Sequence, residues 1–119
     1  MILHIVKRHQ WENALRKGAY APASLDTEGF IHCSTAAQVV DTANLFYRGQ
    51  SDLILVCLEE GDLTSQLTYE PAVRVGDERA DALFQHIYGP LNLEAVSKVY
   101  EFPCDAERRF VLPGALRLP

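Results

Sequence analysis

The chain of 119 residues is long enough for one domain with a hydrophobic core, and its 48% hydrophobic and 23% charged residues exclude a disordered chain. Its net charge of −5 argues against a nucleic-acid-binding surface, so we expect no nucleic-acid partner. The longest apolar run, residues 53–58, is too short to span a bilayer, and the N-terminus lacks the pattern of a signal peptide. We therefore expect a cytoplasmic protein with no membrane partner, and the sequence leaves its oligomeric state open.

The first quarter of the sequence predicts two strands joined by a helix and a long connection. Ile2–Lys7 predicts a strand whose faces are both mostly apolar, so we expect it to be central in a sheet. A helix follows at Gln10–Lys17, and Gly18 stands where a C-terminal cap belongs. The connection 19–29 is longer than usual, and long ordered connections often form a wall of a binding site. It leads to a short strand at Phe30–Ser34.

The middle of the chain predicts a second helix, a buried strand and a helical turn. Thr35 with Gln38 matches a capping box, in which the hydroxyl and the amide each bond to a free backbone group at the start of a helix. Gly49 ends that helix. Leu53–Leu58 is apolar at every position, which indicates a strand buried on both faces. One helical turn is expected at Leu63–Leu67.

The last third of the chain predicts closely spaced strands. The expected elements are a short strand at 67–70 stopped by Pro71, an exposed loop at 74–82, a strand at 83–88, a turn capped by Asn92 that runs to Ala95, and a strand at 96–102. Such spacing leaves no room for crossover helices, which favours antiparallel pairing. We therefore predict an α+β fold with split, mainly antiparallel sheets and two N-terminal helices, in a single domain, 1–119, with a core at 1–102 and a C-terminal tail at 103–119.

Three of the four histidines fall inside predicted strands, namely His4, His32 and His86. A single histidine in a strand is more often a core residue that hydrogen-bonds to the backbone. Three together favour a functional site, because histidine titrates near neutral pH and serves acid–base catalysis. His9 differs from them, since it lies beside Arg8 at a helix start and we expect it to be exposed.

Other polar and aromatic side chains accompany these histidines. Strand alternation puts Ser34 and Tyr88 on the same faces as two of them. Tyr88, Tyr47 and Tyr20 could stack on a planar ring, although aromatic residues at helical or strand spacing more often belong to the core. Glu70, at a strand end, is either an exposed carboxylate or a partly buried one that holds a ribose hydroxyl, orients a histidine or acts as a base.

A metal site is the rival explanation for the histidines. His4, His32 and His86 could converge with Glu70 as a set of three histidines or of two histidines and a carboxylate, but no pair stands at a metal-binding spacing. Cys33 follows His32 on a strand and points to the opposite face, so the two are poorly placed to share an ion. We predict no metal site, and we interpret the three cysteines as structural thiols.

Residues 1–20 carry an excess of positive charge in this acidic chain. Lys7, Arg8, Arg16 and Lys17 stand there against a single acidic residue. Such a patch either attracts a phosphate-bearing small molecule or forms the solvated face of a helix.

Several segments resemble a bacterial family known only as domain of unknown function 952. The matching segments are His4-Ile5-Val6, Trp11 with Gly18-Ala19-Tyr20, Ser24-Leu25, Glu28-Gly29-Phe30-Ile31-His32-Cys33-Ser34, Tyr69-Glu70 and His86-Ile87-Tyr88-Gly89-Pro90-Leu91-Asn92. The Gly-Phe-Ile-His-Cys-Ser and His-Ile-Tyr-Gly-Pro-Leu-Asn segments are the most specific. The resemblance runs from the first strand to about Phe102, which is nearly the whole chain.

This family is in turn similar in fold to the ADP-ribosyltransferases, which bind an extended NAD in a cleft between two small sheets. The resemblance implies that His4 holds a ribose or phosphate oxygen, and that His32, with Ser34, shapes the nicotinamide pocket. His86 or Glu70 would stand in the third position, where an acid stabilises the oxocarbenium-like sugar as nicotinamide leaves.

We therefore expect an enzyme resembling an ADP-ribosyltransferase, or a degenerate relative of one. Catalytic roles are expected for His32, His86 and Glu70, and ligand-binding roles for His4, Ser34, Tyr47 and Tyr88. The expected partner is a small nucleotide-like ligand, with NAD as substrate or ligand and no required cofactor. The alternatives are a non-catalytic ligand-binding module and a metal-dependent hydrolase that uses the clustered histidines.

Overall fold

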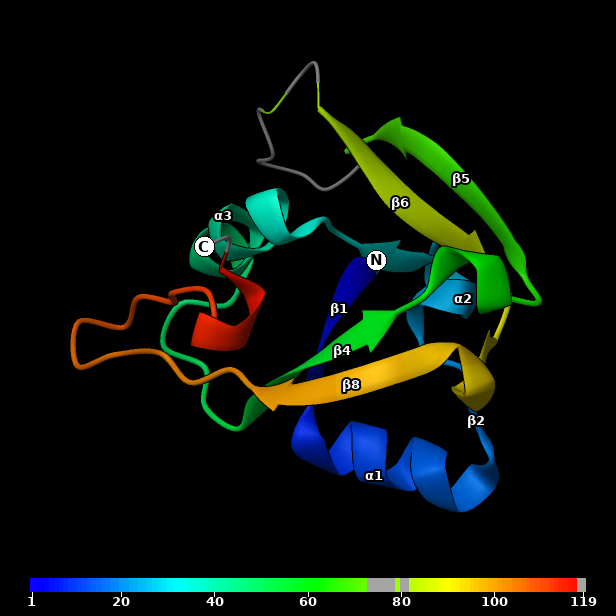
Figure 1. Cartoon of the computed structure of the whole chain (residues 1–119), viewed down its shortest axis with the longest axis horizontal. Coiled ribbons are helices and arrows are strands. Elements are labelled where there is room, and N and C mark those ends of the chain that lie inside the picture. The colour runs from blue at the N-terminus through cyan, green and yellow to red at the C-terminus, as the bar shows by residue number, and fades with distance from the viewer. Residues whose placement is uncertain (73–78, 80–81, 118–119) are drawn as a thin grey trace.

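The computed structural model describes residues 1–72, 79 and 82–117, and within them it shows an α+β chain built on three antiparallel sheets (Figure 1). The strands are β1 (Ile2–Lys7), β2 (Ala19–Tyr20), β3 (Ile31–Cys33), β4 (Leu53–Leu58), β5 (Gln66–Pro71), β6 (Leu83–Tyr88), β7 (Leu91–Asn92) and β8 (Val96–Glu101). The helices are α1 (Arg8–Lys17), α2 (Ser24–Thr27) and α3 (Ala36–Phe46), with 3-10 turns η1 (Glu60–Asp62), η2 (Leu93–Ala95) and η3 (Gly114–Leu116). The predicted α+β fold with mainly antiparallel sheets is confirmed.

The central sheet, with strand order β1-β4-β8, sends alternate side chains into two separate cores. On one face Ile2 and Val6 pack with Trp11 of α1. On the other face Leu3 and Ile5 pack with residues of α3. The two helices therefore cover opposite faces of this sheet, as Figure 1 shows. Every residue of β4 is buried, because this strand lies between β1 and β8 with a helix on each side.

Both long helices have the capping residues that the sequence predicts. Gly18 has a φ of 85°, and its N–H donates to a carbonyl one turn back at 2.9 Å, which ends α1. At the start of α3, the backbone N–H of Thr35 donates to Oε1 of Gln38 at 3.0 Å, as a capping box requires. α1 begins two residues before the predicted start, because the Asp52 carbonyl accepts the otherwise free N–H of Arg8 at 2.9 Å.

A second sheet, with strand order β3-β6-β5, carries most of the predicted site residues. His32 on β3 stands directly opposite His86 on β6. The two three-stranded sheets meet at an antiparallel bridge, in which Leu3 donates its N–H to Ser34 at 2.7 Å and Ser34 returns the bond at 2.8 Å. This bridge brings β1, with His4, beside β3.

The long connection 19–29 is more ordered than the sequence indicates. Tyr20 pairs with Leu91 to form the two-stranded sheet of β2 and β7, and α2 follows it. The hydroxyl of Ser24 donates to the Phe30 carbonyl at 2.7 Å, so α2 is fastened to the segment that leads into β3. Strands of two residues have no periodicity of their own, which is why sequence analysis missed them.

Three local predictions are wrong. Leu63–Leu67, a segment that the structure describes in full, forms no helical turn. Instead β5 begins within it and extends through Pro71, rather than stopping before it; a proline is tolerated there because β5 is an edge strand. The Asn92 side chain does not cap the following turn: it donates to the Asp62 carbonyl at 2.9 Å and accepts from the Thr64 N–H at 3.0 Å.

The segment after Pro103 contributes an aromatic side chain to the core beneath α3. Phe110 is buried against Phe102, and their ring centroids lie 4.9 Å apart. The exposed loop predicted at 74–82 lies outside the described residues, except for Arg79 and Ala82. No helix in the described part of the chain is both long and apolar enough to cross a membrane.

Candidate functional site

The three strand histidines converge on one cavity at the junction of the two larger sheets. His4, His32 and His86 all line it, together with Ser34 and Tyr47. Its volume is about 30 Å³, which leaves room for roughly one or two water molecules. We call this space the inner cavity. It is too small for a nucleotide, so only a water molecule or the end of a ligand would enter it.

His4 is a rigid part of the cavity wall, because both of its ring nitrogens are hydrogen-bonded. Nδ1 lies 2.6 Å from the His32 carbonyl, which only accepts, so Nδ1 carries the proton. Nε2 lies 2.7 Å from the Tyr20 hydroxyl, which donates to it when the ring is neutral. Burial raises the pKa of Tyr20, which keeps this hydroxyl protonated as a donor. Sequence analysis considered Tyr20 for stacking, and missed this contact.

His32 is paired with a carboxylate that sequence analysis did not single out. Its Nε2–H donates to Glu28, which lies four residues earlier across the Gly29 turn. The imidazole is partly exposed, so the pair stands at the mouth of the cavity rather than in the core. The sequence could have indicated Glu28, because it stands four residues before His32 with a glycine between them. The turn at Gly29 folds the Glu28 carboxylate back towards the imidazole.

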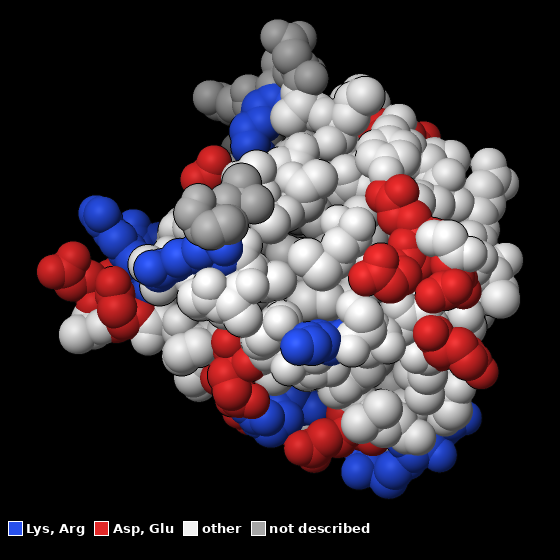
Figure 2. Space-filling view, viewed as in Figure 1, with Lys and Arg blue, Asp and Glu red and all other residues white. Residues whose placement is uncertain are grey.

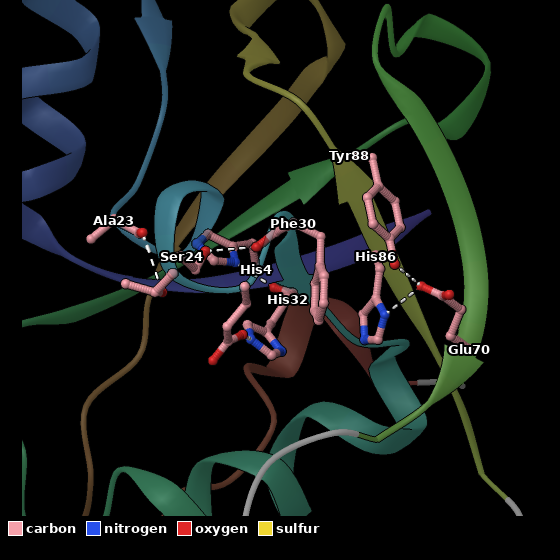
Figure 3. A network of polar contacts seen from close by, with 10 residues as sticks. His4, Ala23, Ser24, Phe30, His32, Glu70, His86 and Tyr88 are labelled. Atoms are coloured by element: carbon pink, nitrogen blue, oxygen red, sulfur yellow. Dashed lines mark hydrogen bonds and ion pairs between the residues drawn. The ribbon is translucent and has the colours of Figure 1, made fainter.

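His86 and Glu70 form a carboxylate–imidazole pair on neighbouring strands (Figure 3). Nδ1–H of the buried His86 donates to Oε1 of Glu70 at 2.9 Å. The same oxygen accepts the hydroxyls of Tyr88 at 2.5 Å and Thr68 at 2.9 Å. These bonds, led by the one from Tyr88, hold the pKa of the Glu70 carboxyl below its ordinary value. Because the carboxylate holds Nδ1–H, Nε2 is the nitrogen of His86 that is left to meet a ligand.

The Phe30 ring packs against both His32 and His86 and restricts the orientation of each imidazole. Its ring stacks on His86 with centroids 3.9 Å apart and an interplanar angle of 20°. The same ring meets His32 edge-on at 4.8 Å, and Figure 3 shows it standing beside both imidazoles. The ring is buried, so both orientations are held by packing as well as by hydrogen bonds.

The side of the inner cavity formed by α3 carries hydroxyls and a cation. The hydroxyl oxygens of Ser34 and Thr42 lie 3.5 Å apart. A guanidinium N–H of Arg79 donates to the Thr42 hydroxyl at 2.8 Å, and its Cζ lies 4.4 Å from the centre of the Phe84 ring. Sequence analysis missed Arg79 because it falls in the segment expected to be an exposed loop.

The structure brings together five of the seven predicted site residues, and attaches the other two to them. His4, His32, Ser34, Tyr47 and His86 line the inner cavity. Glu70 does not line the inner cavity but is bonded to His86, and Tyr88 is bonded in turn to Glu70. Among the described residues, no group of three His, Cys, Asp or Glu side chains is arranged to hold a metal ion.

The inner cavity continues into a larger groove. The groove has a volume of about 250 Å³ and shares His4, Ile5, His32 and Tyr47 with the inner cavity. Its outer wall is formed by Tyr20 and the segment that follows it, residues 22–24. The connection 19–29 therefore does form a wall of the site, as its length suggested.

Comparison with known proteins places the chain in a family. The model of the family described as protein of unknown function (DUF952) matches residues 5–99, so the chain belongs to this family. The chain is similar to the crystal structure of protein CC0527 from Caulobacter crescentus, with 31% identity, a TM-score of 0.85 and coverage of 98% of each chain. It is also similar to the solution NMR structure of that protein, with 31% identity and a TM-score of 0.75 over 91% of this chain and 89% of the other. No curated protein matches the sequence.

Proposed function

We propose that this member of the DUF952 family binds a small nucleotide-like ligand, with NAD or an ADP-ribosyl compound as the leading candidates, in the cleft lined by His4, His32 and His86. The observation that carries the proposal is that all three histidines meet at a cavity which opens into a larger groove. The groove takes the bulk of the ligand, and the inner cavity takes only its end. The resemblance to ADP-ribosyltransferases supports this class of ligand.

The Glu70–His86 pair supports acid–base catalysis in addition to binding. Nε2 of His86 is placed to accept a proton, because Nδ1–H is held by the carboxylate. In the proposed reaction, a water in the inner cavity attacks C1′ of the nicotinamide ribose of NAD. The bond from C1′ to the nicotinamide nitrogen breaks, and its electron pair stays with nicotinamide. The proton of the water passes to His86 and then to solvent, which leaves ADP-ribose, nicotinamide and H⁺.

A non-catalytic binding module is the second candidate, and the state of two histidines favours it. Both ring nitrogens of His4 are hydrogen-bonded within the protein, and Nε2–H of His32 is bonded to Glu28. Imidazoles held in this way shape a pocket without exchanging protons during a reaction. In this case the ligand binds with the same residues and no turnover follows.

Thermal denaturation with NAD, ADP-ribose, nicotinamide, AMP and zinc tests the binding proposal. A ligand present at a hundred times its Kd stabilises the native state by about 2.7 kcal/mol. We expect such a shift with NAD or ADP-ribose in the wild type and in His9→Ala, an exposed histidine outside the cleft, and its loss in His32→Ala. A shift with zinc alone, abolished by a chelator, would instead support the metal-dependent alternative. No shift with any nucleotide would refute the proposal.

Release of nicotinamide from NAD separates the enzyme from the binding module. Glu70→Gln keeps the size of the side chain but removes the carboxylate that holds His86 Nδ1–H. We expect this variant to bind NAD as the wild type does, and to lose most of its turnover. If the wild type binds NAD and releases no nicotinamide, the catalytic step is wrong and the binding module stands.

A further inference from the structure

The groove beyond the histidines continues along the side of α1. A further cavity of about 270 Å³ shares Gln10, Tyr20, Pro22 and Ala23 with the groove of about 250 Å³. The two together fall within the range of about 300–1,000 Å³ that is usual for small-molecule sites. We call the combined space the α1 groove. It runs from the histidines to the C-terminal end of α1.

Basic and amide side chains follow the helix along this groove. Lys7 precedes α1 and lines the end near the histidines, whereas Lys17 lines the far end. Gln10 and Asn13 line the groove between them, at helical spacing. Ten residues of helix span about 15 Å, so the lysines flank a path long enough for an extended ligand.

Apart from Tyr20, the wall opposite the helix carries small side chains. The residues of this wall and of the helix surface facing it include Ala14, Ala19, Ala21, Pro22 and Ala23. Short side chains keep the groove open and let a ligand approach the backbone. The charged side chains that line the α1 groove, Lys7 and Lys17, stand at its two ends.

The charge of the groove is opposite to that of the chain. The protein has a net charge of −5, yet no described residue lining the inner cavity or the α1 groove is Asp or Glu. The lining residues do include Lys7, Lys17 and Arg79. The Glu28 carboxylate lies next to this lining, bonded to His32, and other acidic side chains lie farther away, for example on η1 and η2. Figure 2 shows acidic groups on both sides of the face in view. The two lysines give the part of the α1 groove beside the helix a positive charge, which attracts anions.

We propose that the α1 groove binds the phosphate groups of the ligand, between Lys7 and Lys17, while the sugar end of the ligand reaches the histidines. This inference rests on the proposed function, and adds to it the class of ligand: an extended compound with at least one phosphate. It also assigns a role to the N-terminal basic patch, of which Lys7 and Lys17 line the groove. Arg8 instead bonds to Asp52 and Glu101.

Calorimetric titration of the full chain at low salt, with ADP-ribose, adenosine and inorganic pyrophosphate, tests this inference. The variant is Lys7→Gln with Lys17→Gln, and the matched control is Lys98→Gln, an exposed lysine on β8 outside the groove. We expect the double variant to lose at least tenfold in affinity for ADP-ribose and pyrophosphate, and to bind adenosine within twofold of wild type. The affinity for ADP-ribose should also fall less steeply with added salt in the double variant.

The outcomes separate this inference from the proposed function. If the double variant binds ADP-ribose and pyrophosphate as the wild type does, while His32→Ala loses ADP-ribose, the inference is wrong and the nucleotide cleft stands. If pyrophosphate binds through the two lysines but neither adenosine nor ADP-ribose depends on His32, the groove is an anion site and the proposed function is wrong. If none of the three compounds binds the wild type, both are wrong.

Discussion

The contact between Tyr20 and His4 is the bond that fastens the connecting segment to the first strand, and Tyr20→Phe tests it. The substitution removes one hydroxyl and leaves the ring, so packing against Trp11 is retained. It leaves Nε2 of the buried His4 without its donor, and an unpaired buried polar group costs about 1–3 kcal/mol. We therefore expect the free energy of unfolding to fall by that amount.

Urea denaturation followed by circular dichroism measures this loss. With a slope of about 1–3 kcal/mol per molar, the midpoint should fall by about 0.3–3 M at an unchanged slope. Tyr69→Phe is the matched control, because Tyr69 is half exposed and its hydroxyl meets Glu60 at the surface, where a substitution changes stability by about 0.5 kcal/mol or less. If Tyr20→Phe is no more costly than Tyr69→Phe, the bond between Tyr20 and His4 does not stabilise the fold and this reasoning is wrong.

Three further predictions concern titration and packing. Tyr88→Phe should raise the pKa of Glu70 towards its ordinary value, because it removes the bond that lowers that pKa most. Stability that comes from a lowered carboxyl pKa is lost on acidification, so this variant should lose less stability at low pH than the wild type. Carbon-13 NMR titration measures the pKa of Glu70, which Tyr69→Phe should leave unchanged. Burial raises the pKa of Cys57 to about 11, whereas the thiol of the unfolded chain titrates near the ordinary value of 9.0. The unfolded chain therefore loses this proton first, and the free energy of unfolding should fall as the pH rises from 9.0 to about 11. Urea denaturation over this pH range should show a smaller fall in Cys57→Ala. Phe110→Ala should cost about 3–5 kcal/mol in the same assay, and a loss below about 1 kcal/mol would contradict its place in the core.

The parts of the fold that depend on local pattern were predictable from the sequence. Alternation in Ile2–Lys7 predicted the two faces of β1, and the unbroken apolar run Leu53–Leu58 predicted the buried strand β4. β2 and β7 were not predictable, because two residues such as Ala19–Tyr20 carry no period and their pairing joins distant parts of the chain. The edge strand β5 was misplaced by one residue at Pro71, since the sequence does not show which strand forms the edge.

The site was predictable in its histidines and not in their partners. His32 and His86 share a face with aromatic residues in their own strands, and this pattern was visible in the sequence. That Tyr20 and Arg79 approach the same cavity depends on tertiary contacts of a connection and of a loop, for which no local signal exists. Glu28 is an intermediate case, because a glycine turn and a spacing of four residues bring its carboxylate to His32.

The arrangement of protons distinguishes the three histidines and limits what each one does. His4 has both nitrogens bonded to protein groups, and its Nδ1–H is held by the carbonyl of His32 itself. His32 stands with Glu28 where the groove meets the inner cavity. His86 alone combines burial, a carboxylate on Nδ1 and an Nε2 left for the cavity. In the proposed reaction, proton transfer therefore falls to His86, and we propose that His4 and His32 position the ligand whether or not the cleft is catalytic.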